Sequence, residues 1–266
     1  MNKPMTTAMF CMALLLGGLS SCTTNDVEDI QGGGEQDLYE IKDRALGEYL
    51  VYNCSRTDEN KLPYEMAVAE NGKFYLNTQK AATVENLYLV KNDAQIAKLE
   101  NAGLATAAVK IVDMDGLQFF TALKTLKITS NSVERMDLTA LTELETVEMN
   151  NNSVTALDLS QNTKLIRFRY GGNSAGDTST KLSTISFANN NVIEHIYLKN
   201  QNLQENGFIL PSNYAALKEL DLSNNPAAPF AIPEDLMTQL TTAVGVVADS
   251  EGGGGEDGEL FTIPDK

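Results

Sequence analysis

A repeated unit of twenty-one residues constrains the fold of this chain more than any other feature. The first unit, at Leu123, Leu126, Ile128, Asn131, Val133, Met136 and Leu138, recurs as Leu144, Val147, Met149, Asn152, Val154, Leu157 and Leu159. The spacing Leu-x-x-Leu-x-Leu places the last two apolar side chains on one face of a short strand. A single unit would leave that face in water. Successive units must therefore stack through parallel strand pairing, about 4.8 Å apart, and bury one continuous core.

Further copies extend the pattern and reveal an insertion. The second half of the third copy comes seven residues late, which indicates an insertion at Ser174–Lys181. The fourth copy carries Gln201 where the others carry asparagine. The apolar positions of the third, fourth and fifth copies are Leu165, Phe168, Tyr170, Leu182, Ile185, Phe187, Ile193, Ile196, Leu198, Leu203, Phe208, Leu217, Leu220 and Leu222. An isolated early copy is formed by Val84, Leu87, Leu89 and Asn92.

These units resemble the leucine-rich repeats of a bacterial class with a short, nested twenty-one-residue unit, and Leu144–Lys164 matches that unit closely. The resemblance implies an α/β solenoid: a right-handed coil with short parallel strands whose exposed faces serve for binding. Asparagine suits the turn after each strand, because its amide both donates and accepts hydrogen bonds. Stacked copies are expected to form an asparagine ladder at Asn131, Asn152, Asn173, Asn190 and Asn225.

The ends of such a stack need caps, because terminal units would otherwise expose core and strand edges. Asp37 is a candidate N-cap for a helix whose apolar stripe runs to Leu50. A second helix is expected from Asp93 toward Gly103, with Ile96 and Leu99 inward. A short helix over Pro233–Leu240, with the proline at its first position, and strands at Val244–Val247 and Leu260–Ile263 are expected near the C-terminus. We therefore predict an N-terminal cap region with the early repeat at 37–120, the solenoid at 121–230 and a C-terminal cap at 231–266.

The N-terminus predicts export. Lys3, an apolar run and small residues follow the order of a secretory signal peptide, predicted at 1–21. Leu19-Ser-Ser-Cys22 resembles the bacterial lipobox, in which the cysteine becomes lipidated, and the polar stretch 22–36 is expected to be a flexible tether. This implies an outer-membrane lipoprotein anchored through Cys22, at the cell surface or facing the periplasm. An ordinary cleaved signal with an incidental cysteine is the alternative.

The net charge limits the classes of binding partner, and the cysteine content limits the disulfides that the chain can form. The chain has 36 acidic and 20 basic residues, a formal net charge of −16, so we expect no nucleic-acid binding. Removal of Cys11 with the signal peptide and acylation of Cys22 would leave only Cys54, which excludes an intramolecular disulfide. Stability is then expected to come from packing alone.

Catalytic and metal-binding motifs are scarce. His195 is the single histidine, and no nucleophile elbow, zinc-ligand spacing or phosphate loop is present. The acidic segment Asn53–Asn60 lacks the glycine and spaced carboxylates of a calcium loop, so a solvated loop is favoured. We expect no enzyme activity, cofactor or metal. A hydrolase with paired carboxylates stays open, because such pairs leave no fixed spacing.

One region of the strand face predicts a binding site. Arg167 and Arg169 on one coil are expected beside His195, Tyr197 and Lys199 on the next, forming a basic and aromatic patch. Arginine and tyrosine are enriched at binding hot spots. A mixed solvated face, with acids such as Glu194 nearby, is the alternative. The favoured function is a recognition module for a protein or glycan; the alternatives are a structural envelope component without a ligand and, less favoured, an unrecognised hydrolase.

Overall fold

The structure is a computed structural model that describes residues 37–58, 61–91, 93–104, 109–172 and 182–249. Several sequence predictions concern residues outside these ranges. They are the signal peptide at 1–21, the lipidated Cys22 and its tether, two asparagines of the repeat, Asn92 and Asn173, the insertion at Ser174–Lys181 and the strand at Leu260–Ile263. The structure therefore bears on the caps, the repeats and the strand face.

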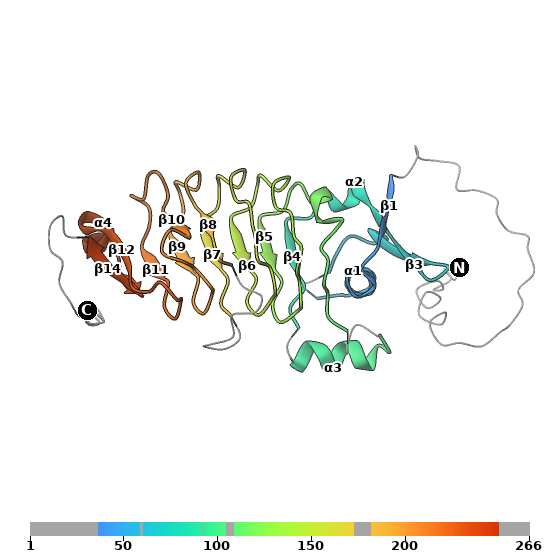
Figure 1. Cartoon of the computed structure of the whole chain (residues 1–266). Coiled ribbons are helices and arrows are strands. Elements are labelled where there is room, and N and C mark those ends of the chain that lie inside the picture. The colour runs from blue at the N-terminus through green and yellow to red at the C-terminus, as the bar shows by residue number, and fades with distance from the viewer. Residues whose placement is uncertain (1–36, 59–60, 92, 105–108, 173–181, 250–266) are drawn as a thin grey trace, which may run out of the picture. The chain divides into compact units, whose positions relative to one another are not determined.

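A seven-stranded sheet organises the molecule (Figure 1). Its order is β13-β11-β9-β7-β6-β5-β4, and every neighbouring pair is parallel. Equivalent positions of successive repeats pair in register, as in Leu126 with Val147 and Val147 with Phe168. The strands are β4 (Asn86–Tyr88), β5 (Thr125–Lys127), β6 (Thr146–Glu148), β7 (Arg167–Arg169), β9 (His195–Tyr197), β11 (Glu219–Asp221) and β13 (Thr242–Val244). The isolated early copy thus supplies the edge strand β4.

The repeat residues form one continuous core. Ile128, Met149, Tyr170 and Leu198, which follow four successive strands, are fully buried. The backbone N–H of each donates to a carbonyl of the next coil, from Ile128 N to Glu148 O at 2.8 Å through to Leu198 N to Asp221 O at 2.8 Å. The predicted solenoid is confirmed, because aliphatic side chains are sealed between coils that pair through parallel strands.

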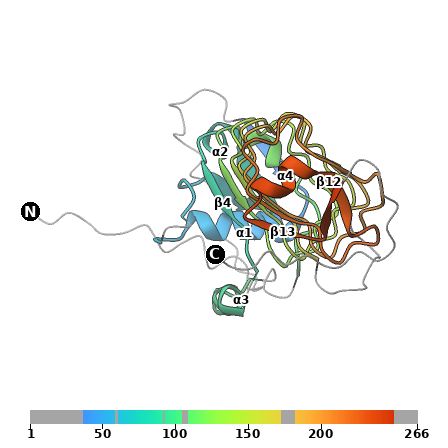
Figure 2. The same ribbon diagram turned by 90° about the vertical axis from the view of Figure 1, so that its left-hand side faces the viewer.

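The second half of each repeat forms the other side of the coil, which Figure 2 shows along the stacking direction. There β8 (Ile185–Ser186) pairs in parallel with β10 (Phe208–Ile209). A row of phenyl rings runs through the coils from Phe168 on β7 to Phe187, Phe208 on β10 and Phe230, with centroids 5.5, 6.0 and 6.3 Å apart. The first side of the coils therefore has more paired strands than the second side, where packing between side chains contributes more of the contacts.

Buried amides form two rows instead of the single ladder predicted. In the first row, Asn131, Asn152 and Asn225 each accept a backbone N–H and donate to carbonyls, and Gln201 replaces asparagine in the fourth copy. The assignment of Asn190 to this row was wrong. Its Nδ2 donates to Leu159 O and Asn162 O, so it belongs to a second row with Asn162. The two half-repeats echo each other in sequence but turn at separate corners of the coil, which separates their amides.

The N-terminal cap differs from the predicted helix. Leu38–Ile41 forms strand β1, which pairs antiparallel with β3 (Lys73–Asn77), and β3 pairs with β2 (Ala67–Glu70). Helix α1 covers Arg44–Cys54, so its N-cap is Asp43 and the assignment of Asp37 was wrong. The predicted stripe was correct from Ala45 onward. Short apolar stretches fit both helical and strand spacing, and pairing with β3 decided for the strand.

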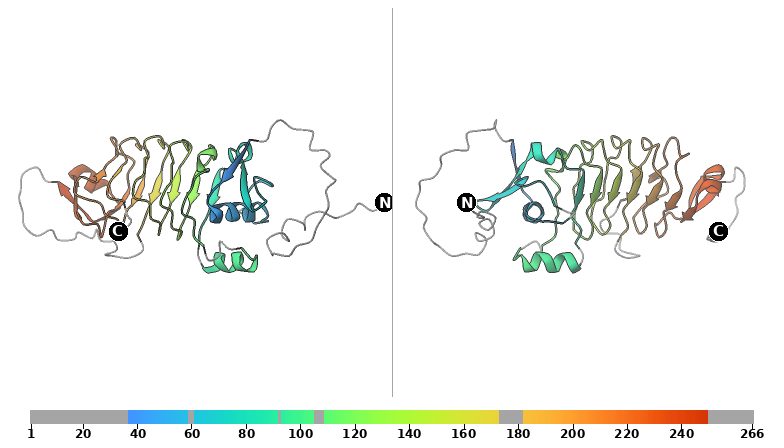
Figure 3. Two further views of the ribbon diagram at one scale, coloured as in Figure 1. Left: turned by 45° about the vertical axis from the view of Figure 1, so that its right-hand side comes forward. Right: turned by 180° about the vertical axis from the view of Figure 1, so that it is seen from behind.

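Other short elements complete the cap. Helix α2 covers Thr78–Ala81 and the 3-10 helix η2 covers Leu117–Phe119. Helix α3 (Figure 3) covers Asp93–Asn101, close to the predicted range. Of the two residues expected inward, Leu99 is buried and Ile96 is half-buried. No helix in the described ranges is long and apolar enough to cross a membrane.

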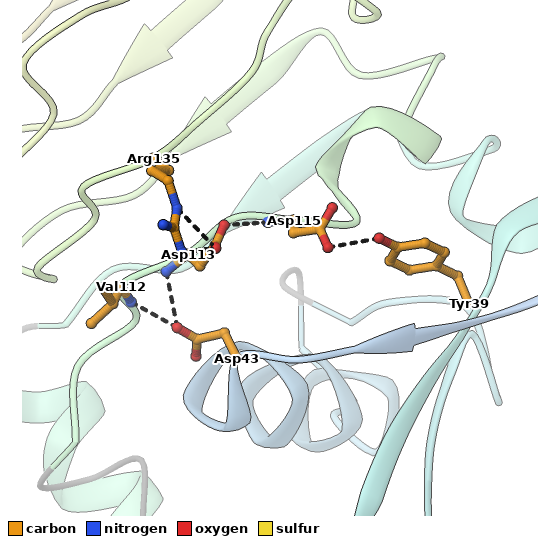
Figure 4. A network of polar contacts seen from close by, with 6 residues as sticks. All are labelled: Tyr39, Asp43, Val112, Asp113, Asp115 and Arg135. Carbon is orange, nitrogen blue, oxygen red and sulfur yellow. Dashed lines mark hydrogen bonds and ion pairs between the residues drawn. The ribbon is translucent and has the colours of Figure 1, made fainter.

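Asp43 joins this cap to the first repeats (Figure 4). Its Oδ1 accepts Leu46 N at 2.9 Å and caps α1, while its Oδ2 accepts the N–H groups of Val112 and Asp113 at 2.8 and 2.9 Å. Two further contacts extend the network, from Tyr39 Oη to Asp115 at 2.6 Å and from Asp113 to Arg135 at 2.6 Å. The Asp43 carboxylate thus caps helix α1 and binds the backbone of a segment that is distant in the sequence, at Val112 and Asp113.

The C-terminal cap covers the other end. Strand β12 (Phe230–Pro233) pairs in parallel with β14 (Val246–Asp249), and helix α4 (Glu234–Gln239) lies between them in sequence. The predicted helix is present, but Pro233 is its N-cap and not its first residue. Gly245 turns the chain between β13 and β14 at φ 72°, where a Cβ would lie 2.6 Å from the Leu222 carbonyl carbon. Only glycine suits this turn.

Candidate functional site

The candidate site lies on the solvent-facing side of β7, β9 and β11. Because side chains alternate along a strand, Phe168 and Ile196 point into the core and their neighbours point outward. The sheet register places Arg167 beside His195 and Arg169 beside Tyr197. The structure therefore brings together four of the five residues predicted for the patch. We call these four residues the strand-face patch.

Tyr197 and the two arginines form the centre of this patch. The Arg169 guanidinium lies over the Tyr197 ring, 4.8 Å from its centroid, in a cation–π contact. Within the described residues, neither arginine makes a side-chain hydrogen bond or an ion pair within 4.0 Å. Their guanidinium N–H groups are thus available to a ligand from outside the chain. Five donors in a planar fork suit carboxylate, phosphate or sulfate groups.

Lys199 lies outside the patch proper. It follows β9 by two residues and is exposed, and its carbonyl accepts Gly172 N of the third repeat at 2.9 Å. In the part of the chain that the structure describes, its ammonium group contacts none of the four patch residues. Lys199 can add positive charge at the edge of the site, but the fold does not hold it there.

A carboxylate that the sequence analysis did not assign to the patch lies inside it. Glu219 on β11 is next to His195 in the sheet register, and its Oε2 lies 2.8 Å from His195 Nδ1. The same oxygen accepts a hydrogen bond from Tyr197 Oη. The description of the patch as basic and aromatic was therefore incomplete. It is a mixed site with two guanidinium groups that hydrogen-bond to no described residue on one side and a hydrogen-bonded carboxylate on the other.

These contacts shift proton affinities in opposite directions. Donation from Tyr197, followed by His195, lowers the pKa of Glu219 below its ordinary value. Burial raises the pKa of Tyr197, and the hydrogen bond to Glu219 raises it further. Glu194 is held by Lys218 at 2.8 Å, and this contact lowers the pKa of Glu194. At neutral pH the site thus carries a fixed carboxylate and a protonated phenol beside the arginines.

Other candidate chemistry finds little support in the geometry. Cys54 is buried, and burial raises the pKa of its thiol. In the loop weighed as a calcium site, Asp58 is hydrogen-bonded and ion-paired to Arg56. Across the described residues, no group of three His, Cys, Asp or Glu side chains could hold a metal ion. The arrangement on the strand face suits non-covalent recognition.

Comparisons with known proteins show a distant likeness to solved structures. No family model matches the sequence, and no curated protein matches it. The functional domain of InlJ from Listeria monocytogenes, described as including a cysteine ladder, is similar at 14% sequence identity and a TM-score of 0.25. The match covers 77% of this chain and 59% of that one, so the chain spans less than two thirds of its length.

The fold itself rests on the geometry above: short parallel strands in one sheet, a twenty-one-residue step from β5 to β6 and from β6 to β7, and buried amides at the turns. The chain folds as a leucine-rich-repeat solenoid. Solenoids of this kind present their strand faces to solvent, and a ligand is recognised by the side chains on that face. The fold alone does not name the ligand.

Proposed function

We propose that this leucine-rich-repeat chain is a membrane-anchored, extracytoplasmic recognition module that binds a protein or glycan through the strand-face patch. The observation that carries the proposal is the pair of guanidinium groups on β7 that hydrogen-bond to no described residue, beside a tyrosine that contacts Arg169 and donates to Glu219. On a chain with net charge −16, such a pair is a local exception. An anionic group on the partner would satisfy both arginines.

A purely structural envelope component would need no such patch. Its strand columns could carry any soluble residues, as Thr125 and Thr146 illustrate on the preceding coils. The preformed contacts of Tyr197 instead hold an aromatic side chain in one orientation next to free donors. Rigid aromatic and arginine side chains are the groups that dominate binding energy at interfaces.

Binding through the patch can be tested by a triple variant, Arg167→Ala, Arg169→Ala and Tyr197→Ala. We expect the parent to retain proteins or glycans from a cell-surface extract and the triple variant to lose them, with retention by the parent falling as salt is raised. A matched control, Lys61→Ala, Lys98→Ala and Tyr64→Ala, removes the same kinds of side chain from the N-terminal cap. Equal capture by the folded triple variant and this control would remove the patch from the proposal.

Anchoring needs a separate test, because it rests on the sequence around Cys22. Cells expressing the full chain are fed an alkyne-bearing fatty acid, and the protein is examined for label and for membrane association. The parent is expected to be labelled and to sediment with outer membranes, and Cys22→Ser is expected to lose the label. A labelled Cys22→Ser variant, or an unlabelled parent, would contradict the lipoprotein assignment.

A further inference from the structure

A groove on the second side of the coils is separate from the strand-face patch. Its volume is about 720 Å³, and its lining comes from four successive coils, at 136–139, 156–158, 184–186 and 206–209. Three steps of about 4.8 Å give it a length of roughly 14 Å along the stack. β8 and β10 form one wall of this groove. A ligand in this groove would lie along the stacking direction and contact successive coils.

Two carboxylates line the groove at equivalent repeat positions. Asp137 and Asp158 are twenty-one residues apart, so they lie on adjacent coils. Asp137 Oδ1 accepts the backbone N–H and the hydroxyl of Thr139 at 2.9 and 2.7 Å, and Asp158 Oδ1 accepts Ser160 N at 2.8 Å. These bonds orient the carboxylates and lower the pKa of both. Each carboxylate has room for further donors, because it offers about four lone-pair sites.

The remaining lining combines an apolar floor with groups that both donate and accept. Met136 and Leu157 are partly buried, and 51% of Ile209 is exposed. The floor of the groove is therefore apolar and accessible to water. The other polar side chains are hydroxyls and one amide, from Thr139, Thr184, Ser186 and Asn206. No lysine or arginine is among the residues that line the groove. The surface therefore offers apolar contact at its base and hydrogen-bond acceptors and donors along its edges.

We propose that this groove binds a linear, neutral glycan whose chain runs along the stack of coils. A sugar ring has the matching chemistry, since its C–H face is apolar and the hydroxyls at its edge both donate and accept. Hydroxyl donation to Asp137 and Asp158 makes charge-assisted hydrogen bonds, which are stronger than neutral ones. The repeat of polar side chains from coil to coil suits a ligand that repeats along its length. This site does not depend on the function proposed for the strand face.

Charge decides between glycan classes and other ligands. An acidic glycan or a nucleic acid would bring its anions against two carboxylates, and among the described lining residues no lysine or arginine offsets them, so like charges repel. A cationic peptide would also pair with the carboxylates, but salt weakens that attraction by screening the charges. The neutral hydroxyl and amide side chains of the groove outnumber its two carboxylates, and they lie beside an apolar floor. This lining favours a neutral polyol.

The test measures binding of the whole chain to fluorescent neutral gluco-, xylo- and manno-oligosaccharides, with an oligolysine as a parallel probe. We expect one neutral series to bind with little dependence on salt. Asp137→Asn with Asp158→Asn should weaken this binding about a hundredfold, about tenfold for each charged acceptor. Ala156→Arg, which fills the groove from an exposed position, should abolish it. Urea unfolding of each variant verifies that it is folded.

Matched variants separate this groove from the rest of the surface. Glu134→Gln with Glu145→Gln removes the same charge outside the groove and should bind like the parent. The triple variant of the strand-face patch should also bind the oligosaccharide normally, so failure of either site is distinguishable from failure of the other. The proposal is overturned if no neutral oligosaccharide binds, if both groove variants bind as the parent does, or if only oligolysine binds and salt removes it.

Discussion

Buried amides satisfy backbone groups that the turn of each coil would otherwise leave unpaired. Asn152 shows the pattern, because its Oδ1 accepts Val133 N at 3.1 Å and its Nδ2 donates to Ile128 O at 2.6 Å and Met149 O at 2.9 Å. Both the donor and the acceptor of one side chain thus link adjacent coils. Unpaired buried polar groups cost free energy, which explains why an amide and not an apolar residue occupies this position.

Replacing Asn152 by alanine tests this role. The variant removes both halves of the amide and leaves buried backbone groups unpaired, so we expect the free energy of unfolding to fall by about 3 kcal/mol. Urea unfolding followed by circular dichroism measures the change. Thr155→Ala, at an exposed position on the same coil, should change stability by less than about 0.5 kcal/mol. Equal effects of the two substitutions would show that the amide bonds contribute nothing.

Glu219 links the strand-face patch to pH. Its pKa is lowered in the folded chain, mainly by donation from Tyr197, so it contributes stability above its ordinary value of 4.5. This contribution is lost as the pH falls through the folded pKa. We expect Glu219→Gln to lose less stability than the parent between about pH 7 and about pH 3, measured from urea midpoints. An equally steep loss in the variant would show that Glu219 is not stabilised as a carboxylate.

Among the elements, helix α1 depends on a single residue at its start. Asp43 uses one oxygen for the N-cap and the other for two N–H groups of the segment before the first full repeat. The helix also packs against β2 and β3, with Ala45, Leu46, Tyr49 and Leu50 buried. The N-cap residue therefore ties the helix to the segment before the first full repeat, and the apolar side chains of the helix pack it against the cap sheet.

Two substitutions at Asp43 distinguish its roles. Asp43→Ala should lower the free energy of unfolding by about 2 kcal/mol, because it removes an N-cap and the bridge to Val112 and Asp113. Asp43→Asn retains one oxygen and should cost about half as much. Urea unfolding measures both, and hydrogen exchange at Val112 and Asp113 should rise in the alanine variant. Unchanged exchange at these amides would contradict the bridge.

At the scale of the whole molecule, stability depends on the continuity of the core between coils. Phe168 is fully buried on β7, in the middle of the sheet, and its ring packs edge-on against Phe187. In a stack, each unit contacts only its neighbours. A defect at the centre therefore weakens the coupling between the two halves, whereas a defect at the surface does not.

Phe168→Ala should lower the free energy of unfolding by about 4 kcal/mol, because it removes a large buried ring and leaves a cavity. The loss of coupling should also broaden the urea transition. Ile166→Ala, at a position 38% exposed on the same coil, should cost about 1 kcal/mol or less. A sharp transition at nearly the parent midpoint for Phe168→Ala would contradict a core that is continuous through β7.

The sequence by itself determined the coil. Apolar residues at a twenty-one-residue step can be buried only by stacking, so Leu126, Val147 and Phe168 had to lie on adjoining strands. The repeat also located Arg167 and Arg169 beside His195 and Tyr197 once the seven-residue insertion between them was allowed for, because register across a regular parallel sheet follows from position in the repeat. Whether a residue is buried depends on its position in the repeat, and successive copies of the repeat carry apolar residues at the core positions.

Only the tertiary structure decided the cap sheet, the second amide row and the groove. Leu38–Ile41 became a strand because β3 was available to pair with it, and β3 lies more than thirty residues away. The register sets Glu219 beside His195 on the adjacent coil, but the side-chain conformations decide that its carboxylate accepts a hydrogen bond from Tyr197. Asp137 and Asp158 line one groove because of how the second halves of four coils pack. Such features depend on contacts between residues that are far apart in the sequence. The periodicity of the repeat does not specify those contacts.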